Sequence, residues 1–432
     1  MRRFSLCLRC TCAISACIAS MLIPIAAWAG LVLTIDTPKL DYLLDECIYI
    51  TVTMKNTGSQ SAEVVNLLTP DMGIVSFEIT PPGDGSRLYN SCGKATLDIS
   101  SIAKSVVRLA PGDKYSASVD LSHEPGDKNP RRLTPLLSRS GQYLIRATYA
   151  THKDWGVDPL IIGSNELRIV VSEPQGADRA TYDLLHCSPS SKVYGPWSLA
   201  GQQTTCFTEL LTRFPQSRYA VYARFYLACW YNLVSGEVYE RGTPEMREAS
   251  KAAAVLFSSV AKATGETPLG VLGMMCAGRN YAKAGDLDLG RSLLEKAFCS
   301  PVATDEDRIQ ALSWLHLLES GYWQTGHSVN ADTRQSLSLR RFAKALGFSV
   351  DWDPATKEAT VSGYRFRSTF RPQVGTMSID GANWSKVAAS LVDAQICVSP
   401  SVVATLMVER WGEGVANTLS SLLAKAPETR KD

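Results

Sequence analysis

The chain has few of the residues from which catalytic and metal sites are built. Five histidines occur among its 432 residues, and they are scattered at positions 123, 152, 186, 316 and 327. No HExxH pair, GxSxG elbow, GxxxxGK[ST] loop or strand-linked GxGxxG is present. The cysteines that follow residue 29 form no CxxC pair and have no zinc-type spacing to histidine. The sequence therefore predicts no metal, no cofactor and no complete catalytic constellation.

The chain also lacks an excess of either charge. It carries 44 basic and 42 acidic residues, with no cluster of positive charge of the kind that binds phosphate backbones, so a nucleic-acid partner is not predicted. Beyond residue 29 no stretch approaches the roughly 18 uninterrupted apolar residues of a spanning helix. We expect a soluble mature chain with no transmembrane segment.

Residues 1–29 have the pattern of a secretory signal. Arg2, Arg3 and Arg9 precede a mostly apolar run, and Ala27-Trp28-Ala29 is a small-x-small cleavage pattern. The mature chain is expected to begin at Gly30, with 41 basic against 42 acidic residues. We expect it to be exported to the periplasm or to the extracellular surface. Two alternatives stay open: a weak twin-arginine signal, and a lipobox that would place a lipid on Cys17.

Eight of the twelve cysteines follow residue 29, and an even number in an exported chain permits disulfides. Cys187 and Cys206 bracket a loop rich in Pro, Gly and Ser, which makes them the first candidate bridge. Cys47 and Cys92 are the second. Other cysteines, such as Cys229 and Cys276, lie inside apolar helical runs and are expected to be buried thiols.

Residues 30–175 alternate like strands, which predicts an all-β sandwich. Six runs rich in β-branched and aromatic residues are separated by turn clusters; they span 31–36, 47–54, 74–80, 115–121, 143–149 and 167–171. The phrases VTMKNTG, LAPGDKYSASVDL and SRSGQYLIRATY resemble the immunoglobulin-like modules of bacterial extracellular proteins. That resemblance implies a spacer or adhesion unit.

Residues 176–328 change to a helical period, with small residues spaced so that antiparallel helices can approach closely. RFPQSRYAVYARFYLACWY and GVLGMMCAGRNYAKAGDLDLGRSLLEKAF resemble tetratricopeptide repeats, the first phrase especially those of outer-membrane-assembly lipoproteins and Tol–Pal coordinators. The resemblance implies two to three repeats that bind a partner protein on the inner face of their first helices. Projected onto this chain, that face would carry Tyr222, Phe225, Asn232, Met275, Arg279 and Lys283. Phe225 and Met275 fit core positions equally well.

Residues 329–432 resemble the small α+β module named after the N-terminal region of copper amine oxidases, a stalk domain of secreted bacterial proteins. RFAKALGFSVDWDPATKEATV, VGTMSIDG and CVSPSVVATLM carry the resemblance, although the opening strand of the family is missing or degraded. The module lies outside the oxidase catalytic domain, so the resemblance implies no copper. The sequence predicts a helix over 337–347, strands on either side of residues 353–356, and a second helix before Gly412.

The acids Asp351, Asp353 and Glu358 resemble a calcium loop superficially. Such a loop requires Gly at its sixth position, and counting from Asp351 that position is Thr356. Asp353-Pro354 is a common turn opener, so the pattern favours a β-hairpin. Similarly, Asp286 or Asp288 in DLDLG is expected to cap a helix.

Taken together, these patterns predict a non-catalytic cell-envelope protein that acts as a protein–protein scaffold through its helices. One alternative is a cell-wall or glycan-binding protein that uses the aromatic residues Trp352, Tyr364, Trp384 and Trp411 of the C-terminal module. The other alternative is a metal-dependent hydrolase that uses His316, Glu319 and His327.

Overall fold

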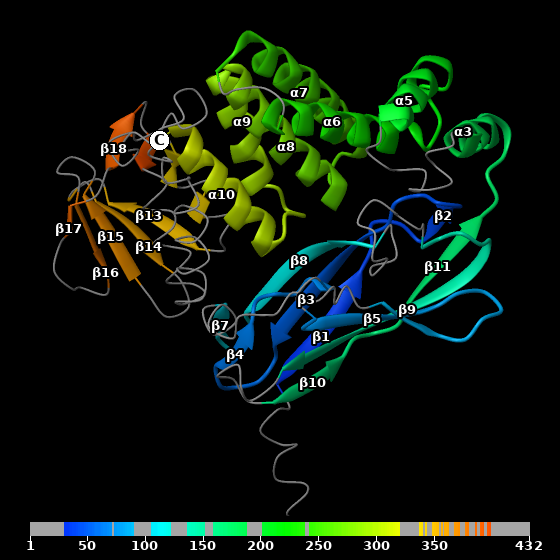
Figure 1. Cartoon of the computed structure of the whole chain (residues 1–432). Coiled ribbons are helices and arrows are strands. Elements are labelled where there is room, and N and C mark those ends of the chain that lie inside the picture. Colours follow the sequence, from blue (N-terminus) through cyan, green and yellow to red (C-terminus); the bar gives the residue numbers. More distant parts are fainter. Residues whose placement is uncertain are drawn as a thin grey trace, which may run out of the picture.

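The computed structural model describes residues 30–70, 73–89, 105–121, 136–151, 159–187, 201–237 and 242–319, together with short stretches between 337 and 398. The expected signal segment, Cys17 and Cys92 therefore lie outside the described residues. Figure 1 shows the N-terminal strands beneath a layer of helices, with further strands toward the C-terminus.

The N-terminal strands carry buried residues at every second position, as the alternation in the sequence predicts. In β11, for example, Leu167, Ile169 and Val171 are buried while the residues between them are exposed. The bounds are β1 (Leu31–Asp36), β2 (Asp41–Leu43), β3 (Tyr49–Asn56), β4 (Ala62–Val65), β5 (Val75–Thr80), β6 (Arg87–Tyr89), β7 (Val106–Leu109), β8 (Lys114–Asp120), β9 (Gly141–Thr151), β10 (Leu160–Gly163) and β11 (Leu167–Ser172). All six predicted strands are confirmed, and the shorter strands β2, β4, β6, β7 and β10 were missed.

These strands form three sheets. One has the order β1-β3-β8, a second has the order β2-β11-β9-β5-β6 with β10 paired to β9, and β4 pairs with β7. The pairs are antiparallel except that β2 lies parallel to β11. Because β2 joins the second sheet and β3 the first, the connection over residues 44–48 crosses between sheets.

Several of the helices begin at side-chain caps that the sequence supplies. Thr243 and Thr267 accept hydrogen bonds from the first turns of α7 and α8, and a proline follows each threonine. Asp286 accepts from Leu289 N at the start of α9, which confirms the expected cap. The bounds are α3 (Gly176–Cys187), α5 (Gly201–Arg213), α6 (Ala220–Glu237), α7 (Pro244–Thr264), α8 (Pro268–Ala284), α9 (Leu287–Phe298) and α10 (Asp305–Glu319).

Most of the described C-terminal residues lie in strands. Their bounds are β12 (Leu337–Ser338), β13 (Ser349–Asp353), β14 (Glu358–Ser362), β15 (Arg367–Arg371), β16 (Thr376–Ile379), β17 (Ser385–Lys386), β18 (Ala389–Val392) and β19 (Gln395–Val398). Strands β13 to β17 form one meander, and β12-β19-β18 a second sheet. The predicted helix over 337–347 is wrong at its start, which is β12, but Leu339, Phe342 and Ala343 are helical as expected. The second predicted helix, before Gly412, lies outside the described residues.

The β-hairpin around Asp353 is confirmed. β13 and β14 pair with Asp353 opposite Glu358, and Thr356 N lies 3.4 Å from Asp353 Oδ1. Asp353 thus accepts from the backbone of its own turn, as its position before Pro354 predicted. Phe348 is buried beside this hairpin, whereas Trp352 is 37% exposed.

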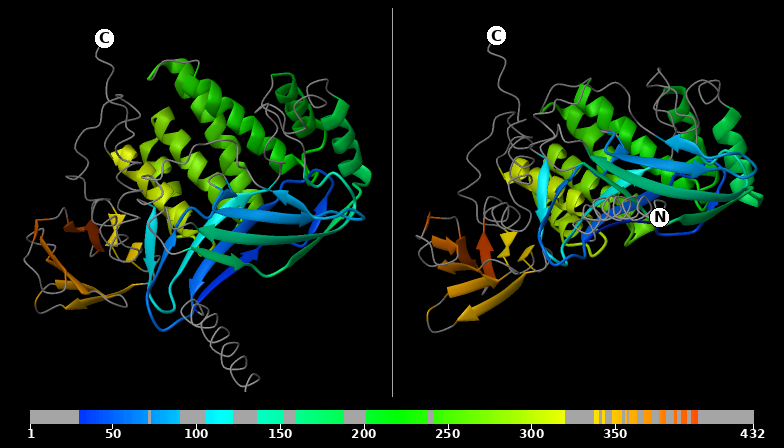
Figure 2. Two further views of the ribbon diagram at one scale, coloured as in Figure 1. Left: turned by 60° about the horizontal axis from the view of Figure 1, so that its bottom comes forward. Right: turned by 90° about the horizontal axis from the view of Figure 1, so that it is seen from below.

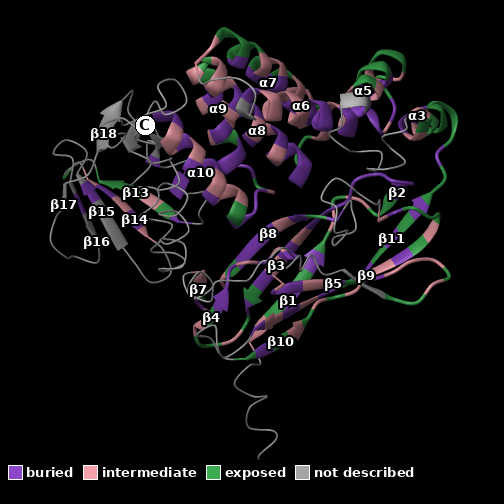
Figure 3. Ribbon diagram, viewed as in Figure 1, coloured by how far each residue is buried: buried purple, intermediate pink, exposed green. Residues whose placement is uncertain are grey.

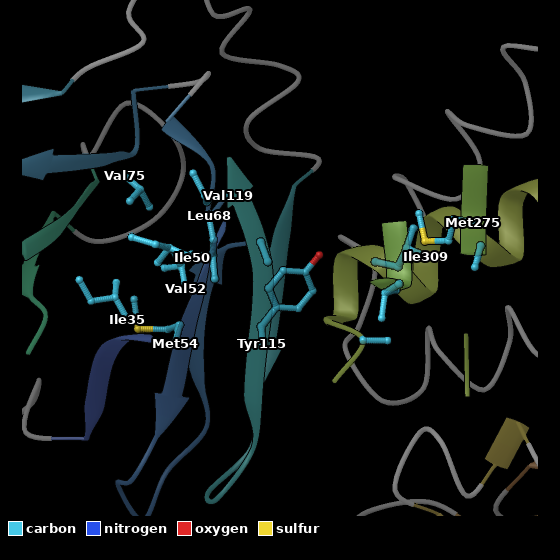
Figure 4. Packing of buried hydrophobic residues seen from close by; sticks show 14 of the residues in the cluster. Ile35, Ile50, Val52, Met54, Leu68, Val75, Tyr115, Val119, Met275 and Ile309 are labelled. Carbon is cyan, nitrogen blue, oxygen red and sulfur yellow. The ribbon is translucent and has the colours of Figure 1, made fainter. Parts of the chain in front are cut away.

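The larger of two hydrophobic clusters among the described residues joins the sheets to the helices. It contains Val52, Tyr115 and Ile145 from the sheets together with side chains of α8, α9 and α10 such as Met275 and Ile309. In Figure 4, Tyr115 of β8 projects from its strand toward the helical residues. Buried residues run along both β3 and β8 and along α8 and α10 (Figure 3).

The contact between β8 and α10 includes specific hydrogen bonds as well as apolar packing. Both Ser116 N and Ser116 Oγ donate to Asp305 Oδ2 at 2.8 and 3.0 Å, and Asp305 is buried at the N-terminus of α10. Viewed from the other directions, the helices still lie against the N-terminal sheets (Figure 2). The protein is thus a mixed α and β molecule whose sheets and helices pack together in shared hydrophobic clusters.

This arrangement contradicts the predicted fold class, an all-β sandwich followed by all-α repeats and a small α+β domain. Periodicity reports the type of each element and the face that it buries, but it does not report what covers that face. Here the buried face of the helices is covered in part by strands 160 residues or more earlier in the sequence, so the two element types form one structure.

Candidate functional site

The strongest candidate site lies where the connection over residues 44–48 meets the helices. Leu44 N donates to Ser172 O, Asp45 N donates to Leu137 O, and Asp45 Oδ2 lies 2.8 Å from His186 Nε2 of α3. Asp45 has φ +58°, in the left-handed region that non-glycine residues rarely adopt. This anchored and locally strained turn fixes the next residue, Glu46, beneath the helices.

Glu46 is a buried carboxylate with four donors. Lys39 Nζ and the Tyr222 hydroxyl bond to Oε1, the latter at 3.1 Å. Leu43 N and Arg218 Nη2 bond to Oε2 at 2.7 and 2.9 Å. Since ionised carboxylates are expensive to bury, this set of donors is what allows Glu46 to remain inside the molecule.

Arg218, just before α6, links the helices to the N-terminal strands. Besides Glu46, its guanidinium contacts Asp41 Oδ2 and Asp41 O at 3.1 and 3.0 Å. Next to it, the Tyr219 hydroxyl donates to Leu44 O at 2.6 Å. The turn between α5 and α6 is therefore bonded to β2 and to the connection that follows it.

A cavity of about 410 Å³ opens beside this cluster. Its walls come from three segments: residues 38–49, the turn and first residues of α6 at 215–224, and the α7–α8 junction at 263–269. We call this cavity the junction pocket. Its basic residues are Lys39, Arg218 and Arg224, and its acidic residue is Glu46.

Burial shifts the titration of the pocket residues. Desolvation lowers the pKa of Lys39, and the neighbouring Glu46 offsets only part of that effect. Desolvation also opposes charge on Arg218, but Glu46 and Asp41 outweigh it and raise the pKa of the guanidinium. Burial together with the carboxylate of Glu46 raises the pKa of Tyr222, which keeps its hydroxyl a donor.

The structure divides the six residues of the predicted inner face into two groups. Tyr222, Phe225 and Met275 are buried. Tyr222 contacts Glu46, Phe225 packs with a cluster that includes Leu43 and Tyr49, and Met275 belongs to the core shared with the sheets. Half of the predicted partner face is therefore occupied by the chain's own strands.

The other three residues lie half-exposed toward the C-terminal ends of α6 and α8. Lys283 Nζ donates to Asn232 Oδ1 at 3.2 Å, which joins α8 to α6. Arg279 lies 5.1 Å above the centre of the Trp314 ring, which joins α8 to α10. We call Asn232, Arg279, Lys283 and Trp314 the helix patch. Trp314 was missed because none of the six projected residues came from the segment that forms α10.

The cysteines do not form the first predicted bridge. Cys187 is a free thiol whose Sγ donates to Leu184 O at 3.0 Å, so no Cys187–Cys206 disulfide exists in this structure. Cys187 ends α3 while Cys206 lies within α5, and their position on either side of a loop did not bring them together. Cys47 is buried 3.9 Å from the Tyr226 hydroxyl, and its proposed partner Cys92 lies outside the described residues.

Cys229 and Cys276 are thiols enclosed by helix packing, as expected. Burial raises the pKa of Cys276 to about 11, and the pKa of Cys229 is raised further by burial and by Cys276. Because the thiolate is the reactive form, neither residue is set up as a nucleophile.

The residues of the two alternative sites are only partly described. Glu319 is buried and accepts from Arg291 Nε at 2.7 Å, while His316 lies one turn earlier on α10 and His327 is outside the described residues. Within the described ranges, no three His, Cys, Asp or Glu residues are grouped to hold a metal. Of the four aromatic residues proposed for glycan stacking, the described one is Trp352.

Apart from Tyr222, which was predicted for the partner face, the residues of the junction pocket could not be found from the sequence. Glu46 is separated by 172 residues from Arg218 and by 176 from Tyr222, and no local motif connects them. The signal available in the sequence was weak: an acidic residue, Glu46, directly before an apolar strand.

No protein-family model and no curated protein matches this chain. Solved structures with partial likeness include a β-glucosidase from Erythrobacter marinus, with 16% identity, a TM-score of 0.19, and coverage of 33% of this chain and 15% of the glucosidase. The sporulation control protein Spo0M from Bacillus subtilis shows 9% identity and a TM-score of 0.20. The match covers 36% of this chain and 54% of Spo0M. Both likenesses are too slight to indicate a fold or an activity.

Proposed function

We propose that this protein is a non-catalytic, exported cell-envelope protein that acts as a scaffold and holds a partner protein at its helix patch. The observation that carries the proposal is the meeting of Asn232, Arg279, Lys283 and Trp314 from three helices in one half-exposed area. The expected export rests on the pattern of residues 1–29.

The chemistry of the helix patch favours an acidic partner segment. Arg279 and Lys283 are one turn apart on α8, so both cations lie on the same face. Trp314 adds a flat aromatic surface, and aromatic and Arg side chains are enriched at protein interfaces. Among the described helices, none combines the length and apolar character that crossing a bilayer requires.

The test is affinity capture from envelope extracts with the folded protein and two charge-reversal variants. Lys283→Glu changes the helix patch, while Lys296→Glu reverses an exposed charge on α9 and is the matched control. We expect Lys283→Glu to weaken capture of the partner at least tenfold, because like charges now face one another, and Lys296→Glu to leave capture unchanged.

Capture by the unmodified protein should weaken as salt is raised, since the proposed contact is electrostatic. The proposal is wrong if the folded protein retains no partner, or if Lys283→Glu and Lys296→Glu capture it equally well.

A further inference from the structure

We infer that the junction pocket binds a small ligand that carries a carboxylate next to an apolar group. This inference does not rest on the helix patch, which belongs to the C-terminal ends of α6 and α8. It rests on the size of the cavity, on its charge and on the state of each polar group in its wall.

The cavity has the size and the lining of a ligand site. At about 410 Å³ it falls in the range of about 300–1,000 Å³ that small-molecule pockets occupy. Pro38, Pro215, Val221 and Leu269 contribute apolar surface from separate segments of the chain. An apolar group of a ligand can therefore be covered from several sides.

The charge of the wall selects an anion. Three basic side chains line the pocket, and its carboxylate, Glu46, already has four donors around its two oxygens. Glu46 thus serves to hold the wall together. A cationic ligand would meet Lys39, Arg218 and Arg224 with no carboxylate left to receive it.

Arg224 supplies the donors that a carboxylate requires. One of its nitrogens, Nη2, donates to Pro215 O at 3.0 Å, and no described carboxylate forms an ion pair with its guanidinium. A guanidinium has five N–H donors in a planar fork that matches a carboxylate. Lys39 Nζ has three donors, of which the ion pair with Glu46 uses one.

The apolar surface beside these cations distinguishes a carboxylate with a hydrocarbon group from inorganic phosphate. Two sources have this chemistry: the C-terminus of a peptide with an apolar last residue, and a free short-chain carboxylic acid. Both present one delocalised negative charge beside an apolar group, so both suit this wall.

The test is isothermal titration of the full mature chain with four probes. They are the tripeptide N-acetyl-Ala-Ala-Leu as the free acid, the same tripeptide as its C-terminal amide, hexanoate, and inorganic phosphate. We expect the free acid to bind at least tenfold more tightly than the amide, because the amide cannot form the charge-assisted pair. Tighter binding of hexanoate than of the tripeptide acid identifies a free carboxylic acid as the source, and the reverse order identifies a peptide C-terminus.

Two variants connect binding to the pocket. Arg224→Gln keeps a long polar side chain at the pocket but removes its charge, and should weaken binding of the acid at least tenfold. Arg213→Gln removes an exposed charge on α5, paired there with Glu209, and should leave binding unchanged. Circular dichroism establishes that each variant is folded.

Amine acetylation gives a second measurement that does not depend on a variant. Lys39 borders the pocket, so bound acid should slow its acetylation relative to Lys296 on α9, as followed by mass spectrometry. The inference is overturned if acid and amide bind equally, if neither acid binds at millimolar concentration, if phosphate binds as tightly as both acids, or if folded Arg224→Gln binds the acid normally.

Discussion

At the scale of single residues, Glu46 shows how one buried charge holds separate segments together. Its oxygens receive Lys39 and Leu43 from the strand side, and Arg218 and Tyr222 from the helix side. Such a carboxylate fixes geometry more than it adds net stability, because its desolvation offsets much of the attraction. Removing its charge, however, leaves the donors around it unsatisfied.

Glu46→Gln should therefore lower the free energy of unfolding by about 1.5–3 kcal/mol, the range for hydrogen bonds to charged groups. Urea unfolding of the two proteins measures this difference. The matched control is Glu63→Gln, which removes a carboxylate from an exposed pair with Arg108 and should change stability by no more than about 1 kcal/mol. Equal effects of the two substitutions would contradict the role assigned to Glu46.

Asp307 at the start of α10 gives a prediction about pH. Burial raises the pKa of this carboxyl, although hydrogen bonds from Thr304 and Ser118 offset part of the effect. The folded protein therefore binds this proton more tightly than the unfolded chain does. The cost of ionised Asp307 is present above the raised pKa and disappears as the pH falls toward the unfolded value of about 3.9.

The free energy of unfolding of the unmodified protein should thus rise relative to that of Asp307→Asn as the pH is lowered from about 7 to about 4. Paired urea titrations across that range measure the difference, which removes the effect of the other titrating groups. A difference that stays constant, or that falls as the pH is lowered, would show that the pKa of Asp307 is not shifted in this direction.

At the scale of elements, α8 and α9 pack at the small residues that the sequence indicated. A methyl group added at Gly278 would lie 2.8 Å from Gly290 O and 2.8 Å from Leu294 Cγ, and one added at Gly290 would lie 2.8 Å from Gly278 O. The two backbones approach too closely for any larger residue. This is the tertiary reason for two glycines inside helices, where glycine otherwise lowers stability.

Gly278→Ala should lower the free energy of unfolding by about 1–3 kcal/mol, because overpacking outweighs the gain in helix propensity. Gly163→Ala is the matched control, since an added methyl group there meets no atom within 4 Å and should change stability by about 0.5 kcal/mol or less. Thermal unfolding of both variants makes the comparison. If Gly278→Ala is as stable as the control, the close approach of α8 and α9 is wrong.

At the scale of the whole molecule, the shared core makes the sheets and helices one cooperative structure. Tyr115 and Met275 belong to the same buried cluster, and Asp305 of α10 holds Ser116 of β8 through two hydrogen bonds. Three successive domains would each have a core of their own and could unfold in separate steps. A joined core should unfold in one step.

Hydrogen exchange in increasing urea tests this cooperativity segment by segment. Peptides from β3 and β8 and peptides from α8 and α10 should lose protection at the same urea concentration. Asp305→Ala should shift both sets together, by an amount that corresponds to about 2–3 kcal/mol. Loss of protection in the helices at a urea concentration that leaves the sheets protected would instead indicate independent domains.

Much of the secondary structure could be predicted because it depends on neighbours in the sequence. The alternation of apolar and polar residues identified β1 and β11. The position of Asp286 indicated where α9 begins. The turn at Asp353 was equally local. The short strands β2 and β4 were missed because strands of three or four residues show too few alternations to be distinguished from loops.

The sites could be predicted only in part. The resemblance to tetratricopeptide repeats placed Arg279 and Lys283 on one face, but it placed Tyr222 and Met275 there as well, and residues of the N-terminal segment cover those two. The junction pocket was not predicted, since Lys39 and Arg218 come from segments far apart in the chain. The expected Cys187–Cys206 bridge failed for the same reason: closeness in sequence does not fix distance across a loop.

The sequence by itself determined the longer N-terminal strands, the helical character of the segment after them, the cap at the start of α9, and which small residues allow the helices to approach. These properties arise from side-chain periodicity, backbone preference and local hydrogen bonds. The tertiary structure alone decided that the N-terminal segment covers half of the predicted partner face of the helices. It also decided that Glu46 lies among donors from both the strand segment and the helices. Those outcomes depend on which buried faces meet, and that is settled by packing the whole chain and by pairing every buried charge.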